Sequence, residues 1–567
     1  MADVDTAATS PASESQADVF IQRRDGRLWL GKDPFRFAGC NIYWLGLDEN
    51  VGGVDFPSEF RVRDALETAK EMQLRVVRAH TLGISYGTED KSFCEGPGKF
   101  VHDNLRMADY AITVAKELGL RLIVPLMDKW DYYHGGMKHF TRWRGKERRE
   151  DFYTDPQVIE DFKTYISELV SHVNPHTGLA WKDEPCIMCW ETGNELDSPP
   201  EWTRQIADHI KKEAPRQLVM DGRWGVDPAC LAIDSVDIVS NHYYFVPAVE
   251  LGRDVYGGAW SAQQQGKCFV VGEYDWKGYP YGTLVPFLNM VESSQCVTGD
   301  LFWSLFPHHD DGGFVAHHDG FTLHYPGDDA RMRDRARLIR QHACRMRGDP
   351  APAAHRIPSA PHITQIQHSH IRWRGATGAA TYSIEVSLSD DTSSGHHKWH
   401  PLVQQHITAD PKESDGQSSA TLASPFSSLP LLATDFSPPK SRFSLPLYFA
   451  SHAAPLPPAA PSACESPFPM SCGDNLFVRA MNRAIEGSEA LVSEWVAWRA
   501  GEAEGGWKTH RGLWGVLLDT LLKEGRVGQK QTRLYFRVRG MNLDGLPGPY
   551  SDVVAFDVSK ANGERGA

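Results

Sequence analysis

Short apolar segments alternate with helical patterns along the first part of this chain, and this alternation limits the folds open to it. Eight apolar segments have the length and composition of buried strands: residues 35–42, 74–80, 121–126, 186–190, 217–220, 236–242, 269–272 and 300–303. Amphipathic helical patterns follow several of them, at residues 57–72, 104–118, 155–173 and 201–212. Eight strand-then-helix units over roughly 330 residues predict an α/β fold, a (β/α)8 TIM barrel.

The chain has 567 residues, too many for one compact core, and its composition changes after the barrel region. We expect a disordered tail at 1–17, the barrel domain at 18–347 and a Pro- and Ala-rich linker at 348–358. Alternating residues at 371–375 and 382–386 predict a smaller all-β sandwich at 359–558, with an irregular insertion at about 389–470. The segment 534–551 resembles the last hairpin of a fibronectin type III sandwich.

Two glutamates stand at the ends of predicted strands. Glu195 closes the motif Asn194-Glu195 after the fourth strand, and Glu273 follows Gly272 at the end of the seventh. A barrel brings the carboxyl ends of its strands together on the face that carries active sites. Retaining hydrolysis of a glycosidic bond needs two carboxylates about 5 to 5.5 Å apart, one as acid/base and one as nucleophile. The two positions therefore predict a glycoside hydrolase.

Residues from about 18 to 345 resemble glycoside hydrolase family 5, and within it the β-mannanase-like members. The resemblance implies that Glu195 is the acid/base and that Glu273 is the nucleophile. It also implies that Asn194 is a hydrogen-bond partner of the sugar 2-hydroxyl.

Four more positions match the family in type and place. Arg78, at the end of the second strand, resembles the arginine that supports the nucleophile. His242 and Tyr244 resemble the pair that lines the cleft after the sixth strand. Trp303, at the end of the eighth strand, resembles the aromatic floor under the sugar. An arginine beside the nucleophile would keep that carboxylate ionised.

The expected activity is retaining, endo-β-mannanase-like hydrolysis of β-mannan or a related β-linked glycan. A β-glucanase or β-glucosidase of the same family is an alternative, and so is a carbohydrate-binding barrel without turnover. The two-carboxylate mechanism calls for no cofactor and no metal. A carbohydrate is the expected partner, whereas the sequence leaves endo or exo action and the oligomeric state open.

Charge and hydropathy exclude other partners. The net charge of -14 argues against a nucleic-acid binder. No apolar run is long enough to span a membrane. Residues 1–18 are polar and lack the apolar centre of a secretion signal, which predicts a cytoplasmic protein, or a secreted one if a leader was removed.

Several other motifs permit a second interpretation. Gly83-x-Ser85-x-Gly87 fits the serine-hydrolase elbow, but a loop-like sequence follows it where that elbow needs a helix. The basic run 142–149 is expected to be a solvated loop.

Five histidines after the eighth strand are expected in a cleft-edge loop instead of a metal site: His308, His309, His317, His318 and His324. Five cysteines in strand-like runs are expected to be buried free thiols: Cys40, Cys186, Cys189, Cys268 and Cys296. Five tryptophans after strands either stack on sugar rings or pack loops: Trp44, Trp130, Trp202, Trp224 and Trp276.

Overall fold

The computed structural model describes residues 19–79, 91–131, 133–278, 282–317, 319–366, 370–387, 400–407, 419–421 and 533–557. The sequence predictions that lie outside these residues are the N-terminal tail, the motif at 83–87, His318 and nearly all of the insertion at 389–470. One compact unit comprises residues 1–366, 371–420 and 533–556, and the second consists almost wholly of residues outside the described set.

Eight parallel strands close into a barrel, which confirms the predicted fold class. In chain order they are β4 (Phe37–Asn41), β5 (Val76–Arg78), β8 (Arg121–Pro125), β9 (Ile187–Glu191), β10 (Leu218–Met220), β11 (Ile238–Tyr243), β12 (Cys268–Asp275) and β13 (Val297–Trp303). The last strand closes on the first, with Gly299 opposite Phe37. Each predicted strand therefore exists, and the fourth and seventh are β9 and β12.

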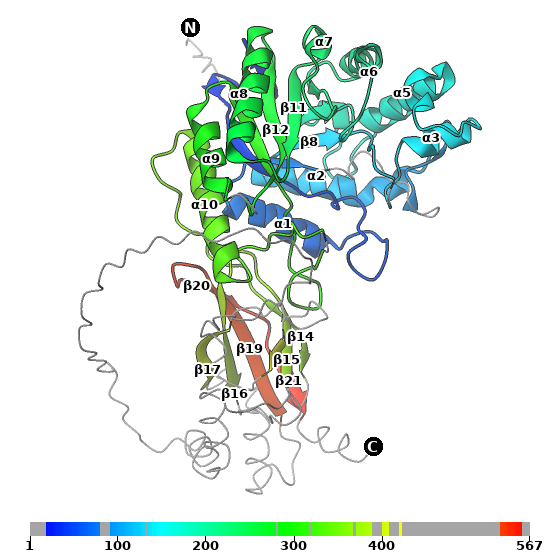
Figure 1. The fold of residues 1–567 in the computed structure, drawn as a ribbon. Helices are drawn as coiled ribbons and strands as arrows, with labels where there is room; N and C mark the ends of the chain where they lie inside the picture. The colour runs from blue at the N-terminus through cyan, green and yellow to red at the C-terminus, as the bar shows by residue number, and fades with distance from the viewer. Residues whose placement is uncertain are drawn as a thin grey trace, which may run out of the picture. The chain divides into compact units, whose positions relative to one another are not determined.

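A helix follows each barrel strand and covers the outside of the sheet (Figure 1). They are α1 (Glu59–Glu71), α2 (Arg106–Leu118), α5 (Pro156–Ser171), α6 (Pro200–Glu213), α7 (Pro228–Leu231), α8 (Ala248–Gln264), α9 (Leu284–Ser293) and α10 (Ala330–Arg347). Side chains at the helix starts accept from free backbone N–H groups, as Ser58 does from Arg61 and Asp155 from Val158. Gly348, in the left-handed conformation, ends α10 where the barrel domain was predicted to end.

Apolar side chains fill the barrel at the starting ends of its strands. This cluster includes Phe37, Val76, Leu218, Ile238 and Cys268, all buried. A three-stranded sheet of β1 (Ile21–Arg24), β2 (Arg27–Leu30) and β3 (Asp33–Pro34) adds Ile21 and Leu28 to it. Because this end is closed by apolar packing, polar side chains can gather only at the opposite, carboxyl end of the strands.

Short elements interrupt the loops of the barrel. They are β6 (Cys94–Gly96), β7 (Lys99–Phe100), η4 (His102–Leu105), α3 (Met137–Trp143), α4 (Asp151–Thr154) and η5 (Trp181–Asp183). The prediction of a loop over 142–149 was wrong at its start, since α3 ends inside this run at Trp143. The other basic residues pair with acids: Arg144 with Asp161 at 2.6 Å and Lys146 with Asp155 at 2.6 Å.

Two further sheets follow the barrel along the chain. One contains β14 (His362–Ile366), β15 (His370–Arg374) and β18 (Ser419–Thr421). The other contains β17 (His400–Ile407), β16 (Thr381–Ser387), β19 (Arg533–Met541), β20 (Pro547–Tyr550) and β21 (Val554–Asp557). A smaller sheet-rich region is therefore confirmed. Its fibronectin type III character and the domain boundaries stay predictions.

The eight described cysteines are free, and all except the half-buried Cys296 are buried, as expected of packed thiols. Burial raises the pKa of the Cys40 and Cys186 thiols well above the ordinary value, so they stay protonated. Among the described helices, none is long and apolar enough to cross a membrane.

His342 on α10 lies between two carboxylates, and this arrangement makes stability depend on pH. Its Nδ1 lies 2.8 Å from Glu292 Oε1, and its Nε2 lies 2.9 Å from Asp300 Oδ2. Burial lowers the pKa of His342, but the charges of Asp300 and Glu292 and their hydrogen bonds outweigh burial and raise it to about 9. Since the folded pKa exceeds the ordinary 6.5, this stabilisation is complete below pH 6.5 and is lost as the pH rises through 9.

We therefore expect the free energy of unfolding to fall by about 1–3 kcal/mol between pH 6.5 and 9, because the imidazolium loses its proton. Urea unfolding of the native chain and of His342→Gln across this range measures it, and the variant should lack most of the decline. His176→Gln, at an exposed position, is the matched control. Equal declines in the native chain and in His342→Gln would contradict the assignment.

Candidate active site

Glu195 and Glu273 meet at the carboxyl ends of the strands, as predicted. Glu195 follows β9, Glu273 lies within β12, and both are buried. His242 on β11 lies between them, with Nδ1 2.8 Å from Glu195 Oε1 and 3.6 Å from Glu273 Oε2. One carboxylate oxygen of each glutamate and one ring nitrogen of His242 all lie within 4.8 Å of one another. Residues distant in sequence thus converge on a space the size of one reacting centre.

The backbone at Glu195 has an uncommon conformation. Glu195 has a φ of 55°, in the left-handed region that residues other than glycine seldom adopt. The turn before it packs against the neighbouring strand end, where a Cβ on Gly222 would lie 1.7 Å from the carbonyl oxygen of Gly193. Leu196 N donates to Gly222 O at 2.8 Å, so both sides of Glu195 are tied to this segment. Such strain persists where surrounding contacts impose it, and it concentrates at functional sites.

Irregular pairing aims His242 and Glu273 at the centre. The register between β11 and β12 shifts between Asn241 and His242, and β12 pairs irregularly with β13 between Val271 and Tyr274. A bulge of this kind redirects the side chain beside it. Gly272 permits the close approach, since a Cβ there would lie 2.6 Å from His242 Nε2.

Arg78 binds the predicted nucleophile and more. Its Nη1 donates to Glu273 Oε1 at 2.8 Å, and its Nη2 donates to Asn194 Oδ1 at 2.8 Å. Its Nε and Nη2 also donate to the two oxygens of Glu191, at 2.7 and 2.9 Å. Burial lowers the pKa of Arg78, but the charges of Glu191 and Glu273 outweigh it and hold the pKa above the ordinary value.

Glu191 and Asn41 were missed by sequence reasoning. Glu191 is the last residue of β9 and is 1% exposed, and Asn41 on β4 accepts from Arg78 Nη1 at 3.1 Å. A charged residue ending an otherwise apolar strand was the available signal, because a buried carboxylate requires a partner.

The remaining predicted residues surround the glutamates. Tyr244 donates its hydroxyl hydrogen to Glu273 Oε2 at 2.5 Å. Burial, together with the charge of Glu273, raises the pKa of Tyr244 well above the ordinary value, so it stays a donor. Trp303 stacks on Tyr43 at 5.4 Å and donates to Asp319 Oδ2 at 2.6 Å. Asn194 Nδ2 donates to Asp128 Oδ2 at 3.2 Å.

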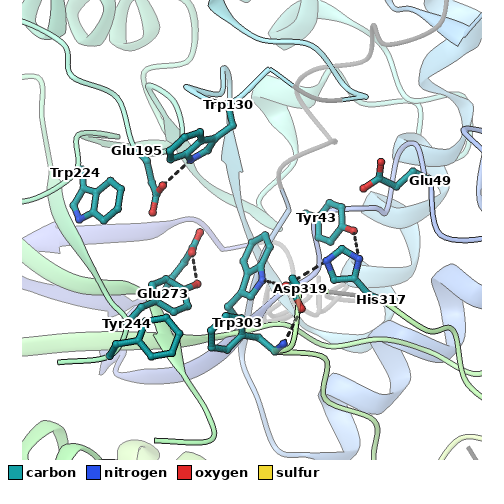
Figure 2. Close-up of a pocket in the computed structure, with 12 residues that line it drawn as sticks. Tyr43, Glu49, Trp130, Glu195, Trp224, Tyr244, Glu273, Trp303, His317 and Asp319 are labelled. Atoms are coloured by element: carbon teal, nitrogen blue, oxygen red, sulfur yellow. Dashed lines mark hydrogen bonds and ion pairs between the residues drawn. The ribbon is translucent and has the colours of Figure 1, made fainter. Parts of the chain in front are cut away.

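A pocket of about 560 Å³ contains both glutamates (Figure 2). Its lining comprises Tyr43, Glu49, Trp130, Glu195, Trp224, Tyr244, Phe245, Glu273, Trp303, His317, Asp319 and Phe321. Trp130 also donates Nε1–H to Glu195 Oε2 at 2.7 Å, which holds that carboxylate from the side opposite His242. Of the five tryptophans with two interpretations, Trp130 and Trp224 line the pocket, whereas Trp44, Trp202 and Trp276 are buried and pack.

The described histidines of the loop after β13 pair with separate groups. His308 lies 3.0 Å from Asp64, His317 lies 3.2 Å from Asp319, and His324 lies 2.8 Å from Asp328. His317 lines the pocket, in agreement with a cleft-edge loop, and His318 lies outside the described residues. In the described part of the chain, the group with ligand atoms close enough for a metal ion is Glu195, His242 and Glu273, the same three that form the centre.

Known sequences resemble the barrel region. Residues 18–236 match the model of a family described as GH family 5 beta-mannosidase-like. Putative mannan endo-1,4-beta-mannosidase P of Arabidopsis thaliana is 28% identical over 251 residues, 40% of this chain and 60% of that protein. Mannan endo-1,4-beta-mannosidase 2 of Oryza sativa subsp. japonica is 31% identical over 221 residues, 36% of this chain and 48% of that protein. The chain thus spans less than two thirds of the length of these relatives.

Solved structures agree on the fold. The endo-beta-1,4-mannanase from Thermotoga petrophila matches with a TM-score of 0.50 and 26% identity, over 64% of this chain and 88% of that chain. A glycoside hydrolase family 5 mannosidase from Rhizomucor miehei matches with a TM-score of 0.50 over 59% of this chain and 99% of that chain. At 18% identity the latter shows the fold alone. The expected resemblance of the barrel region to family 5 mannanases is confirmed.

Because Glu191 shares Arg78 with Glu273, its substitution tests the buried network. We expect Glu191→Gln to lower the free energy of unfolding by about 3 kcal/mol, since a buried guanidinium loses part of its compensating charge. Urea unfolding measures the loss. Asp183→Asn, which breaks the exposed pair with Arg216, is the control and should cost less than about 1 kcal/mol. Equal losses of unfolding free energy in the two variants would show that Glu191 contributes no more to stability than an exposed ion pair.

Proposed function

We propose that this chain is a retaining glycoside hydrolase of family 5 that cleaves β-linked mannan or a related β-glycan. The observation that supports this proposal most directly is that a carboxylate oxygen of Glu195 and one of Glu273 lie within 4.8 Å of each other at the carboxyl ends of the barrel strands. Retaining enzymes hold their carboxyl groups about 5 to 5.5 Å apart, whereas inverting enzymes need roughly 6.5 to 9.5 Å to admit a water molecule between.

In the first step, the Glu273 carboxylate attacks the anomeric carbon of a sugar bound over Trp303. The bond from that carbon to the leaving-group oxygen breaks, and the oxygen takes a proton from Glu195. The sugar is then esterified to Glu273, and Glu195 is a carboxylate.

In the second step, water attacks the anomeric carbon from the side the leaving group vacated. Glu195 accepts a proton from this water, and Glu273 leaves as a carboxylate, which restores both groups. Retention follows because each displacement inverts the anomeric carbon once.

The neighbouring side chains suit these roles. Arg78 and Tyr244 donate to different oxygens of Glu273, which favours its ionised form and fixes its orientation. Trp130 Nε1–H donates to one oxygen of Glu195 and His242 Nδ1 lies against the other, which fixes the orientation of this carboxyl group. Asn194, oriented by Arg78 and Asp128, is placed next to the acid/base to bind the sugar 2-hydroxyl. No step requires a metal or an organic cofactor.

Mannan is proposed as the substrate because the relatives are named as mannan endo-1,4-beta-mannosidases and a structural neighbour as an endo-beta-1,4-mannanase. A reducing-sugar assay over mannans, β-glucans and aryl β-glycosides discriminates this from glucan cleavage. Glycan binding without hydrolysis of any of them would favour a non-catalytic barrel.

The two glutamates should respond differently to substitution. Glu273→Ala should reduce hydrolysis to background on every substrate, because no covalent intermediate forms. Glu195→Ala should lower kcat/KM on unactivated glycans by about 10²–10⁴-fold, and far less on a dinitrophenyl glycoside, whose leaving group needs little protonation. Steady-state kinetics of both variants measure this.

Glu147→Ala, at an exposed position outside the pocket lining, is the control variant and should keep the activity of the native chain. Activity that persists in purified Glu273→Ala would end the nucleophile assignment. An equal loss on activated and unactivated substrates in Glu195→Ala would end the acid/base assignment.

The anomeric form of the first product tests the mechanism directly. Because two inversions restore the configuration, proton NMR during the first minutes of hydrolysis should show the β-anomer before mutarotation. Early appearance of the α-anomer would mean inversion, which the short Glu195–Glu273 approach does not accommodate.

A further inference from the structure

Three separate parts of the chain meet at one buried carboxylate outside the pocket lining. Asp64 lies on α1 and is 2% exposed. Its Oδ2 accepts from the backbone N of His308 at 2.8 Å and lies 3.0 Å from His308 Nδ1. Its Oδ1 accepts from Thr377 Oγ1 at 2.6 Å. Asp64 therefore connects α1 to the loop between β13 and α10 and to the turn between β15 and β16 of the sheet-rich region.

Asp64 stays ionised in this position. Burial opposes its ionisation, but the charge and hydrogen bonds of His308 and the hydrogen bond of Thr377 outweigh burial and lower the pKa of Asp64. Hydrogen bonds to an ionised carboxylate are stronger than those between neutral groups. The connection between the three parts is therefore a strong one.

The turn that carries Thr377 is fixed by its own sheet. Ala376 N donates to the hydroxyl oxygen of Tyr382 at 2.9 Å, and Tyr382 is a buried residue of β16. Ala380 N donates to Met541 O on β19 at 2.7 Å. Strands β16 and β19 pair directly with each other, so the sheet-rich region determines where the hydroxyl of Thr377 lies.

The same turn packs against the His308 ring. A Cβ on Gly375 would lie 2.1 Å from His308 Cδ2, so the backbone of the turn touches the imidazole. The ring of Phe314 stacks on this imidazole with centroids 4.4 Å apart, and His308 is 3% exposed. A side chain that is close-packed and bonded to Asp64 has little freedom to move.

His308 begins the segment that leads back to the pocket. It pairs with Phe314 in an antiparallel bridge, and Val315 N donates to Pro307 O at 3.0 Å. His317 follows two residues later and lines the pocket. A shift of His308 would therefore be transmitted along this short, bonded hairpin to the pocket wall.

The preceding turn of α1 holds the tip of the same hairpin. Arg61 Nε lies 2.8 Å from Asp310 Oδ2, and Arg61 also pairs with Asp48. Asp48 directly precedes Glu49, another residue of the pocket lining. The first half of α1 thus connects two loops of the pocket, and Thr377 bonds to this half of the helix through Asp64.

We propose that the turn at 375–379 of the sheet-rich region is a positioning element for the pocket. Thr377 is its positioning residue, and it acts through Asp64 and His308 on the loop that carries His317. The kinetic consequence rests on the proposed hydrolase function. Because this loop carries neither Glu195 nor Glu273, loosening it should weaken substrate binding more than it slows the chemical steps.

The test removes the hydroxyl of Thr377 from the full-length chain. Thr377→Val keeps the shape of the side chain, and it should raise KM about fivefold while kcat changes less than about twofold, the effect of losing one hydrogen bond. Kinetics are measured with mannohexaose and cellohexaose. Thr377→Ser keeps the hydroxyl and should restore the native KM. Thr164→Val, which loses an exposed bond to Glu160 O on α5, is the matched control.

Amide hydrogen exchange, followed by mass spectrometry, measures the loop without any substrate. Thr377→Val should accelerate exchange in peptides covering 305–317 by about fivefold, because the loop opens more readily without this bond. Peptides covering 187–196, which include Glu195, should exchange as in the native chain. Thr164→Val should leave both regions unchanged.

The outcomes separate this proposal from the hydrolase function. Turnover with a native KM in Thr377→Val, or a raised KM that Thr377→Ser fails to restore, would overturn the positioning role and leave the hydrolase intact. A native chain that hydrolyses no glycan would overturn the hydrolase. In that case, faster exchange at 305–317 in Thr377→Val would keep the positioning role, and unchanged exchange would overturn it as well.

Discussion

The guanidinium of Arg78 is fully buried, and it holds side chains that come from three other barrel strands or their ends. Asn41 belongs to β4, Glu191 and Asn194 come from β9 and its following turn, and Glu273 belongs to β12. Removing a cation from water is costly unless geometry and charge compensate it. The geometry of its donors compensates this cost, because a planar guanidinium can donate to both oxygens of Glu191 and still donate to Glu273.

Departures from regular sheet geometry also orient the side chains of the site. Bulged pairing beside His242 turns its ring toward Glu195, and the lack of a side chain at Gly272 makes room for that ring. Apolar packing closes the opposite end of the barrel, so the polar network is confined to one face. Each glutamate is then held through both oxygens, which limits the reorganisation left for the reacting state.

The fold and the central pair could be predicted because their signals are local. Apolar strands such as β9 and β12 are visible as runs, and a barrel necessarily brings their carboxyl ends together. Glu191 was overlooked because its importance depends on Arg78, a partner far away in sequence. Trp130, Glu49 and Asp319 lie in loops, where no periodicity reveals direction, and the bulge beside His242 has no sequence signature.

Glu195 stands on left-handed backbone, where glycine or asparagine would lie more comfortably. Glycine or asparagine at this position would raise the stability of the fold, and stabilising substitutions of this kind are commonly available to natural proteins. A glutamate at this position therefore indicates that the function of its side chain outweighs the cost of its backbone conformation. Asp25, Gln73 and Phe245 share the left-handed conformation, so it is the conformation together with the contacts of the Glu195 carboxylate that supports the role proposed for this residue.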